Sequence, residues 1–102
     1  MKVIIGPTAQ RQIDHQLQFS VEKFGLQTAE KNFGRVEFFF AATLANFPRT
    51  GRRLSQPNLY ESMIARTPFV VIYRIEPEHD TVRVLGFYHY AQDRDGTGDN
   101  DN

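Results

Sequence analysis

The residues best suited to chemistry in this chain are arginines and aromatic residues in its second half. Six arginines lie between residues 49 and 83, and the aromatic segment Phe87–Tyr90 follows them, with Arg94 close behind. Arginine presents a planar fork that binds phosphate or carboxylate, while tyrosine and histidine stack on bases or transfer protons. This set favours a surface that binds a nucleic acid or an acidic partner. The alternative to a binding surface is that Arg74 and Arg83 simply occupy the solvent face of a hairpin, as charged strand residues usually do.

Several other kinds of site lack the residues that they need. The chain contains no cysteine, which excludes disulfides, thiolate zinc sites, iron–sulfur clusters and thiol nucleophiles. It has no glycine-rich phosphate-binding motif and no HExxH motif, and His15, His79 and His89 are widely separated. We therefore predict no metal and no cofactor, with His15 on the solvated face of a helix and His79 in a turn.

The net charge of zero conceals an uneven distribution. The chain has 12 lysines and arginines and 12 aspartates and glutamates, but residues 95–102, DGTGDNDN, contain three aspartates and no basic residue. Residues 1–94 therefore carry a net charge of +3, with 12 basic against 9 acidic side chains. The last segment has no large apolar side chain and cannot offset the entropy of ordering. We predict one folded domain at residues 1–94 and a disordered acidic tail at residues 95–102.

Length and hydropathy narrow the class of protein further. A chain of 102 residues has room for a single domain. Its first apolar run, residues 3–5, is shorter than the roughly 7–15 residues of a signal-peptide core, and no run approaches the roughly 20 residues that cross a bilayer. These features predict a soluble cytoplasmic protein without a membrane partner. The small positive charge of residues 1–94 would attract a negatively charged partner only weakly over long range. This favours a protein partner over free DNA or RNA.

Two amphipathic helices should precede the arginines. Thr8 is a candidate N-cap for a first helix that ends at Phe24 before Gly25, and Thr28 is a candidate N-cap for a second helix that continues to Pro48. A linker of about three residues makes these helices antiparallel neighbours. Apolar residues at helical spacing form one stripe on each helix: Ile13, Leu17, Val21 and Phe24 on the first, and Ala29, Phe33, Val36, Phe40, Leu44 and Phe47 on the second.

The second helix has two unusual features. Gly34 lies in the middle of the helix, where we expect it to allow close helix packing. Phe38, Phe39 and Phe40 span about 200° of the helix circumference and cannot all face one core stripe. At least one of these rings should therefore meet a second surface.

Four strand-like segments complete the chain. One lies at residues 2–5, and three lie at residues 59–65, 69–75 and 81–88, after a segment at 48–58 whose prolines, glycine and arginines indicate a loop. A polar five-residue turn joins the last two strands and suits an antiparallel hairpin. The order β-α-α-β-β-β predicts an α+β fold, in which an antiparallel helical hairpin packs on one face of a small, mainly antiparallel sheet.

Taken together, motifs along residues 3–94 resemble the RelE/ParE toxin superfamily of bacterial toxin–antitoxin modules, on the ParE side. The resemblance rests on the order and spacing of the following residues: Phe24-Gly25, Ala29, Phe47-Pro48 with Gly51 and Arg52, Val71 to Ile75, and Val82 to Leu85 leading to His89. The architecture of this family is the one that the periodicity predicts.

The resemblance implies a toxin that binds its target without cleaving RNA. Members that cleave mRNA on the ribosome grip phosphate with one arginine early in the penultimate strand and one after the last strand. These positions are Val70 and Gln92 here, and no tyrosine or lysine follows Tyr90. Cleavage also needs an acid, a base and charge stabilisation. ParE-like members lack that set and poison DNA gyrase; their usual ending, His-x-x-Arg-Asp, corresponds to His89 through Asp93, with Gln92 in place of the arginine.

From the residues and the resemblance together, we predict that the protein has no catalytic residue and binds its target through a surface. We predict that this target is DNA gyrase. The residues assigned to this surface are Arg74, His89, Tyr90 and Arg94, with Arg52 and Arg53 as additional contacts. One alternative is a RelE-like ribosome-dependent endoribonuclease that uses Arg74, His89 and Arg94. Another is an inactive toxin-like protein kept for antitoxin binding.

The resemblance also implies a cognate ParD-like antitoxin, in a hetero-oligomer encoded by a plasmid-stabilising module. We assign its contact to Phe38 and Phe39, because an amphipathic partner helix can place its apolar face over exposed rings. The alternatives are that these rings cover the edge of the core or form a homodimer.

Overall fold

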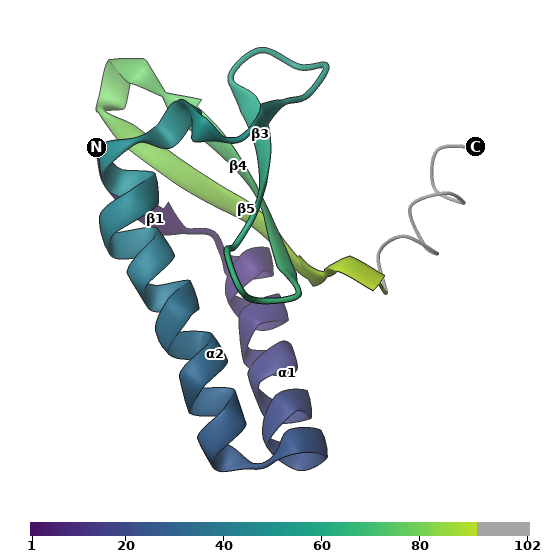
Figure 1. Ribbon diagram of the computed structural model, residues 1–102. Coiled ribbons are helices and arrows are strands. Elements are labelled where there is room, and N and C mark those ends of the chain that lie inside the picture. The colour runs from purple at the N-terminus through teal and green to yellow at the C-terminus, as the bar shows by residue number, and fades with distance from the viewer. Residues whose placement is uncertain (92–102) are drawn as a thin grey trace, which may run out of the picture.

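The computed structural model describes residues 1–91, which form two helices and a five-stranded sheet (Figure 1). The main elements in chain order are β1 (Lys2–Ile5), α1 (Pro7–Phe24), α2 (Leu26–Phe38), β2 (Arg52–Arg53), β3 (Leu59–Met63), β4 (Phe69–Glu76) and β5 (Thr81–His89). Shorter helical turns occupy Phe39–Leu44, Pro48–Thr50 and Pro77–His79. The predicted acidic tail at residues 95–102 lies outside the described residues, as do Gln92 and Arg94.

The strands lie in the order β1-β5-β4-β3-β2. Neighbouring strands are antiparallel except for β1 and β5, which run parallel with Val3 opposite Val82. The two helices pack side by side against the sheet (Figure 1). This architecture confirms the predicted α+β fold. The assignment of all of residues 48–58 to a loop is wrong at β2, which pairs with β3 through backbone bonds that composition does not reveal.

Alternating residues of β4 and β5 fill the core beneath the helices. The residues of β4 that alternate from Phe69 to Ile75 are buried, as their spacing predicts. Phe33 of α2 lies 5.1 Å from Phe69 and 6.2 Å from Phe87, measured between ring centroids, and the rings of Phe69 and Phe87 lie 4.9 Å apart. Because aromatic rings bury the largest apolar areas, this trio fixes α2 on the sheet.

Glycines, and not the expected threonines, set the helix boundaries. α1 begins at Pro7 next to the N-cap residue Gly6, because proline is preorganised for the first helical turn. The linker between the helices is Gly25 alone, with φ 92°, a conformation that favours glycine. The chain reverses within one residue, so Thr8 and Thr28 lie inside α1 and α2 and the prediction that they cap these helices is wrong.

The apolar stripe expected on α1 is only partly buried. Gln16 and Ser20 are buried in its place, while Leu17 and Phe24 are 38% and 57% exposed. Figure 1 shows the reason: the end of the helical hairpin around Gly25 extends beyond the sheet. The sheet therefore leaves the apolar side chains at this end uncovered.

α2 continues into a π-helical turn at Phe39–Leu44, and the helical segment ends before Pro48 as predicted. Phe38 is 66% exposed, whereas Phe39 is 7% exposed and belongs to the core. One ring of the phenylalanine run thus reaches the surface. A Cβ on Gly34 would meet no atom within 4 Å, so the expectation of close helix packing at Gly34 is wrong.

Candidate functional site

The sheet face opposite the helices carries three linked side chains, which we call the Glu61 cluster: Arg52 of β2, Glu61 of β3 and Tyr88 of β5. The Glu61 carboxylate accepts hydrogen bonds from the Arg52 guanidinium and from the Tyr88 hydroxyl. Because successive strand residues face opposite sides, burial of Tyr60 and Phe87 places Glu61 and Tyr88 on the open face. The cluster joins three strands and compensates the charge of Arg52.

Tyr73 of β4 positions the segment that carries Arg52. Its hydroxyl donates to the Pro48 carbonyl at 2.7 Å and accepts from the Gly51 N–H at 3.2 Å. Burial raises the pKa of Tyr73, while the hydrogen bond from Gly51 opposes that shift. A Cβ on Gly51 would lie 2.5 Å from Tyr73 Oη and 2.8 Å from the Glu61 carbonyl oxygen, so glycine is needed for this close approach of β2 to β3.

Arg74 and Arg83 lie opposite each other on β4 and β5 but differ in their partners. Arg83 donates two hydrogen bonds to the Glu76 carboxylate, at 3.0 Å from Nε and 3.3 Å from Nη2. These bonds lower the pKa of Glu76, and the same carboxylate raises the pKa of Arg83. Arg74 donates to the neutral amide oxygen of Gln56 at 3.3 Å and has no carboxylate partner within residues 1–91. The charge of Arg74 is therefore available to a ligand.

His89 lies far from Arg74. It pairs with Phe69, five residues along β4 from Arg74, and a strand of that length spans about 17 Å. The His89 ring contacts the edge of the Phe69 ring at 6.0 Å between centroids, on the helix side of the sheet. Arg74 follows the buried residue Tyr73 and faces the open side. The structure therefore does not bring Arg74 and His89 together.

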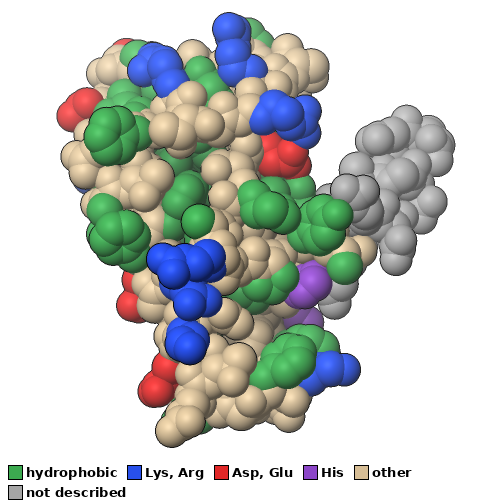
Figure 2. Space-filling view, viewed as in Figure 1, with side chains coloured by type: hydrophobic (Ala, Val, Ile, Leu, Met, Phe, Trp, Pro, Cys, Tyr) green, Lys and Arg blue, Asp and Glu red, His purple; other side chains and the backbone are tan. Residues whose placement is uncertain are grey.

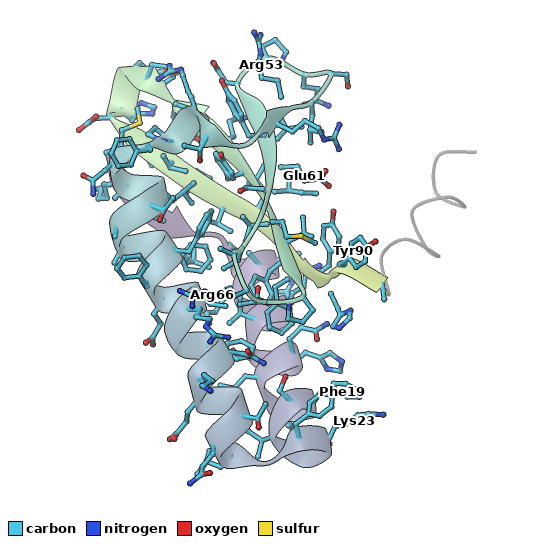
Figure 3. The ribbon with its side chains drawn as sticks, viewed as in Figure 1. Phe19, Lys23, Arg53, Glu61, Arg66 and Tyr90 are labelled. Carbon is cyan, nitrogen blue, oxygen red and sulfur yellow. The ribbon has the colours of Figure 1, made fainter. Side chains whose placement is uncertain are left out.

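The remaining predicted target contacts lie at two ends of the sheet. Arg53 is exposed on β2, and Figure 3 shows it at the opposite end of the sheet from Tyr90. Tyr90 is 43% exposed, and its N–H donates to the Pro68 carbonyl at 2.8 Å. Arg94 lies outside the part of the chain that the structure describes. We call the two groups of predicted target contacts the arginine end, made of Arg52, Arg53 and Arg74, and the aromatic end, made of His89 and Tyr90. Because Arg53 pairs with the buried residue Tyr60, it faces the opposite side of the sheet from Arg52.

Glu61 is the residue of this surface that the sequence did not single out. Its side-chain partners, Arg52 and Tyr88, are 9 and 27 residues away in the chain. One signal in the sequence could have pointed to Glu61: it is a carboxylate at an outward position of a strand, close in sequence to an arginine-rich segment.

A second region, which we call the α2 hollow, lies between α2 and the β3–β4 turn and has a volume of about 450 Å³. Three cations and three apolar residues dominate its lining: Lys31, Arg35, Arg66, Phe38, Phe39 and Ile64. Within residues 1–91, none of these cations pairs with a carboxylate. Figure 2 shows a basic patch at this place, where Figure 3 labels Arg66.

The two residues predicted to bind an antitoxin both line the α2 hollow. Phe38 has most of its ring accessible at the rim, whereas Phe39 is packed into the core cluster. Antitoxin contact stays a prediction for both residues. Because Phe39 is buried and Phe38 is exposed, Phe38 has the larger apolar area left for a partner to cover.

Neither a metal site nor a membrane-spanning helix is present within residues 1–91. His15 is exposed on α1, and His79 lies in the turn before β5, each in the place predicted. Within residues 1–91, no group of three or more acidic or histidine side chains is arranged to hold a metal ion. None of the helices in the described part of the chain combines the length and apolar character needed to cross a membrane.

Comparison with solved structures finds the same fold in bacterial toxins. The chromosomal ParDE system from P. aeruginosa superposes with a TM-score of 0.66 at 17% identity, covering 87% of this chain and 95% of that chain. The RelBE2 toxin–antitoxin complex from Mycobacterium tuberculosis gives a TM-score of 0.60 at 24% identity, covering 86% and 88%. The isolated E. coli RelE toxin gives 0.56 at 13% identity, covering 86% and 82%.

Sequence comparison gives the family. No curated protein matches the chain by sequence. A family model, described as the ParE toxin of the type II toxin–antitoxin system parDE, matches residues 3–94. That span includes every helix and nearly every strand residue of the shared fold, so the chain belongs to the ParE toxin family, within the RelE/ParE superfamily.

Proposed function

We propose that the protein is a toxin that inhibits DNA gyrase by binding it, and that a cognate antitoxin neutralises it. The observation that carries this proposal is the separation of Arg74 from His89, on opposite faces of the sheet. Cleavage of RNA through its 2′-hydroxyl needs an acid, a base and a cation around one phosphate. The residues assigned to the endoribonuclease alternative, Arg74 and His89, are not brought together around one site, which favours action by binding.

Charge pairing supports the same conclusion. Arg52 pairs with Glu61 and Arg83 pairs with Glu76, so an external phosphate would have to compete with a carboxylate at each of these guanidinium groups. Val70 stands where RNA-cleaving relatives are expected to have an arginine, and it is 6% exposed. The choice of gyrase as the target comes from membership of the ParE family.

The proposed target surface has two parts. At the arginine end, Arg53 and Arg74 have no carboxylate partner within residues 1–91, and their charges suit an acidic protein surface. At the aromatic end, Tyr90 offers an exposed ring, and Arg94 follows it in the sequence. A specific interface usually buries about 800 Å² on each partner, an area that can include contacts at more than one place on a small protein.

We assign the antitoxin to the α2 hollow. An amphipathic acidic segment could place an apolar side chain over Phe38 and carboxylates beside Lys31 and Arg66. Support for such a partner comes from the family itself and from the intact E. coli RelBE toxin–antitoxin complex, whose toxin shares this fold.

The test is supercoiling by purified gyrase in the presence of the toxin without its antitoxin. The double variant Arg74→Gln with Tyr90→Ala should raise the inhibitory concentration about tenfold, equivalent to about 1.4 kcal/mol of binding free energy. A matched control, Arg11→Gln with Phe19→Ala, removes an arginine and an exposed ring from α1 and should leave inhibition unchanged.

Two other outcomes would contradict the proposal. Codon-positioned cuts in mRNA on purified ribosomes, with gyrase unaffected, would identify a RelE-like endoribonuclease. Normal growth of cells induced without antitoxin, together with retained antitoxin binding, would identify an inactive toxin-like protein. Gyrase inhibition instead predicts filamentous cells and induction of the DNA-damage response.

A further inference from the structure

The α2 hollow concentrates positive charge that the fold does not compensate. Lys31 and Arg35 reach it from α2, and Arg66 reaches it from the β3–β4 turn. The Arg35 guanidinium donates to the Arg66 carbonyl at 3.0 Å, which holds the Arg35 side chain against the Arg66 backbone. Arg66 has φ 63°, a conformation uncommon for residues other than glycine, asparagine and aspartate. Like charges gathered in this way form a site for an anionic ligand.

Gly34 provides an independent indication that something covers the hollow. Glycine destabilises the middle of a helix by about 0.5–1 kcal/mol relative to alanine. A Cβ at Gly34 would meet no atom within 4 Å, so packing inside the described molecule does not require glycine. Gly34 lines the hollow, where the missing side chain leaves the helix backbone open to close approach by a ligand.

The described part of the chain ends within reach of this hollow. The Tyr90 N–H donates to the Pro68 carbonyl, and Pro68 lies two residues after Arg66. Because two residues of extended chain span at most about 7 Å, the Arg66 backbone lies within about 15 Å of Tyr90. Asp95, five residues beyond Tyr90, has a reach of about 17 Å. The carboxylates that follow Tyr90 can therefore reach the cations of the hollow.

Charge complementarity identifies these carboxylates as the occupant. Residues 92–102 contain four aspartates and one arginine, a net charge of −3, whereas residues 1–91 contain 11 basic and 8 acidic side chains, a net charge of +3. The α2 hollow is lined by three cations without a carboxylate partner within residues 1–91, whereas two other hollows along α1 are lined by one arginine and by none.

We infer that the acidic segment at residues 92–102 of this chain docks in the α2 hollow, with its aspartates against Lys31, Arg35 and Arg66. The segment would compete there with any acidic ligand from another molecule, including the antitoxin proposed above. A tethered segment of this length has an effective concentration of the order of millimolar, so weak ionic contacts are enough to populate the docked state. The inference concerns this chain alone and stands whether or not gyrase is the target.

Paramagnetic broadening in nuclear magnetic resonance spectra tests the docking directly. Because the chain has no cysteine, Thr97→Cys allows a single spin label between Asp95 and Asp99 on the full-length protein. We expect the label to broaden the amide signals of Gly34 and Ala65, which line the hollow. Raising the salt concentration from about 20 mM to about 0.5 M shortens the Debye length from about 20 Å to about 4 Å and should reduce that broadening at least about twofold.

Two charge variants separate docking from simple proximity. Changing the four tail aspartates to asparagine should remove the salt-dependent broadening, and Lys31→Gln with Arg66→Asn should do the same, with asparagine chosen because it tolerates positive φ. A matched pair, Lys2→Gln with Arg49→Gln, removes two exposed cations elsewhere and should leave the broadening unchanged. If the hollow variant does not fold, the tail variant still decides the result.

Three outcomes would overturn the inference. Broadening that is equal in the wild-type and asparagine tails would show that charge does not direct the segment. Broadening centred on the arginine end at Arg53 would place the segment at another site. Broadening that appears only when spin-labelled and isotope-labelled molecules are mixed would assign the hollow to a second copy of the chain. None of these results depends on gyrase inhibition or on the antitoxin, so the inference and the proposed function fail separately.

Discussion

The Glu61 cluster and the α2 hollow both contain arginines, yet they use them in opposite ways. In the Glu61 cluster, Arg52 and Tyr88 donate to one carboxylate, whose side chain is 23% exposed. In the α2 hollow, Arg35 donates to a neutral carbonyl group, so its charge stays uncompensated within residues 1–91. A guanidinium paired inside the protein contributes to the fold, whereas one without such a partner can contribute to binding.

The glycines of the two regions show the same contrast. Gly51, beside the Glu61 cluster, is enclosed by a tyrosine hydroxyl and a backbone carbonyl, while Gly34, at the α2 hollow, faces open space. One region is packed against itself, whereas the other leaves open space beside the helix backbone. Stability measurements on matched variants can therefore test whether the two regions differ in this way.

The largest effect is expected for Gly51→Ala. The new methyl group would overlap the Tyr73 hydroxyl and the Glu61 carbonyl, and overpacking of this kind costs about 1–3 kcal/mol of the free energy of unfolding. Urea denaturation followed by circular dichroism measures the loss. Wild-type stability in this variant would show that β2 moves away from β3 at no cost, and Tyr73 would lose its assigned role in positioning Arg52.

Glu61→Gln should have the next largest effect. It removes the charge that accepts hydrogen bonds from Arg52 and Tyr88, and we expect a loss of about 1 kcal/mol because one partner is an exposed cation. Lys31→Gln is the control from the α2 hollow and should change stability by less than about 0.5 kcal/mol. Equal destabilisation by the two variants would remove the distinction between compensated and uncompensated charge.

Gly34→Ala should act in the opposite direction. Alanine is the better helix former, and the space at this position is open, so unfolding should cost about 0.5–1 kcal/mol more than in the wild type. Thermal denaturation monitors the gain. The same variant should weaken docking of an acidic ligand in the hollow, and an unchanged affinity would mean that the ligand does not approach the helix at Gly34.

The smallest effect concerns the pH dependence of the Arg83–Glu76 ion pair. Hydrogen bonds from Arg83 lower the pKa of Glu76 below its ordinary value of 4.5. The pair therefore stabilises the fold above that ordinary value, and the contribution is lost as the pH falls through the folded-state pKa. Glu76→Gln should be less stable than the wild type at pH 7, with a difference that disappears in acid. Glu78→Gln, which removes an exposed carboxylate two residues away, should show no such convergence.

Much of the fold was predictable because it depends on short-range periodicity. The alternation in β4 and the helical spacing from Ala29 to Phe47 report which residues share a face, and the structure buries most of them as expected. The helix boundaries were less predictable, since Gly25 reverses the chain in one residue where the sequence suggested about three. Tertiary coverage also overrode the pattern on α1, where Leu17 is more exposed than Gln16.

The candidate site was predictable in its residue types and less so in its grouping. The sequence singled out Arg52, Arg53 and Arg74, and the structure gathers them at one end of the sheet. It did not reveal that His89 faces the other side, because a register shift between Ile72 and Tyr73 intervenes in the pairing of β4 with β5. An irregularity of this kind changes which side chains meet, and it leaves no clear mark in composition.

Three properties could be derived from the residues alone: the order of the two helices and of four of the five strands, the absence of thiol chemistry, and the contrast between a basic body and an acidic last segment. These properties follow from residue type and local spacing, which act over a few residues. Three other features became visible only in the folded chain: β1 joins β5 in parallel, Glu61 compensates Arg52, and Lys31, Arg35 and Arg66 gather without a carboxylate partner within residues 1–91. The physical reason is that charge compensation depends on distance in space, and residues such as Arg35 and Arg66, 31 positions apart in the chain, become neighbours only when the helices pack on the sheet.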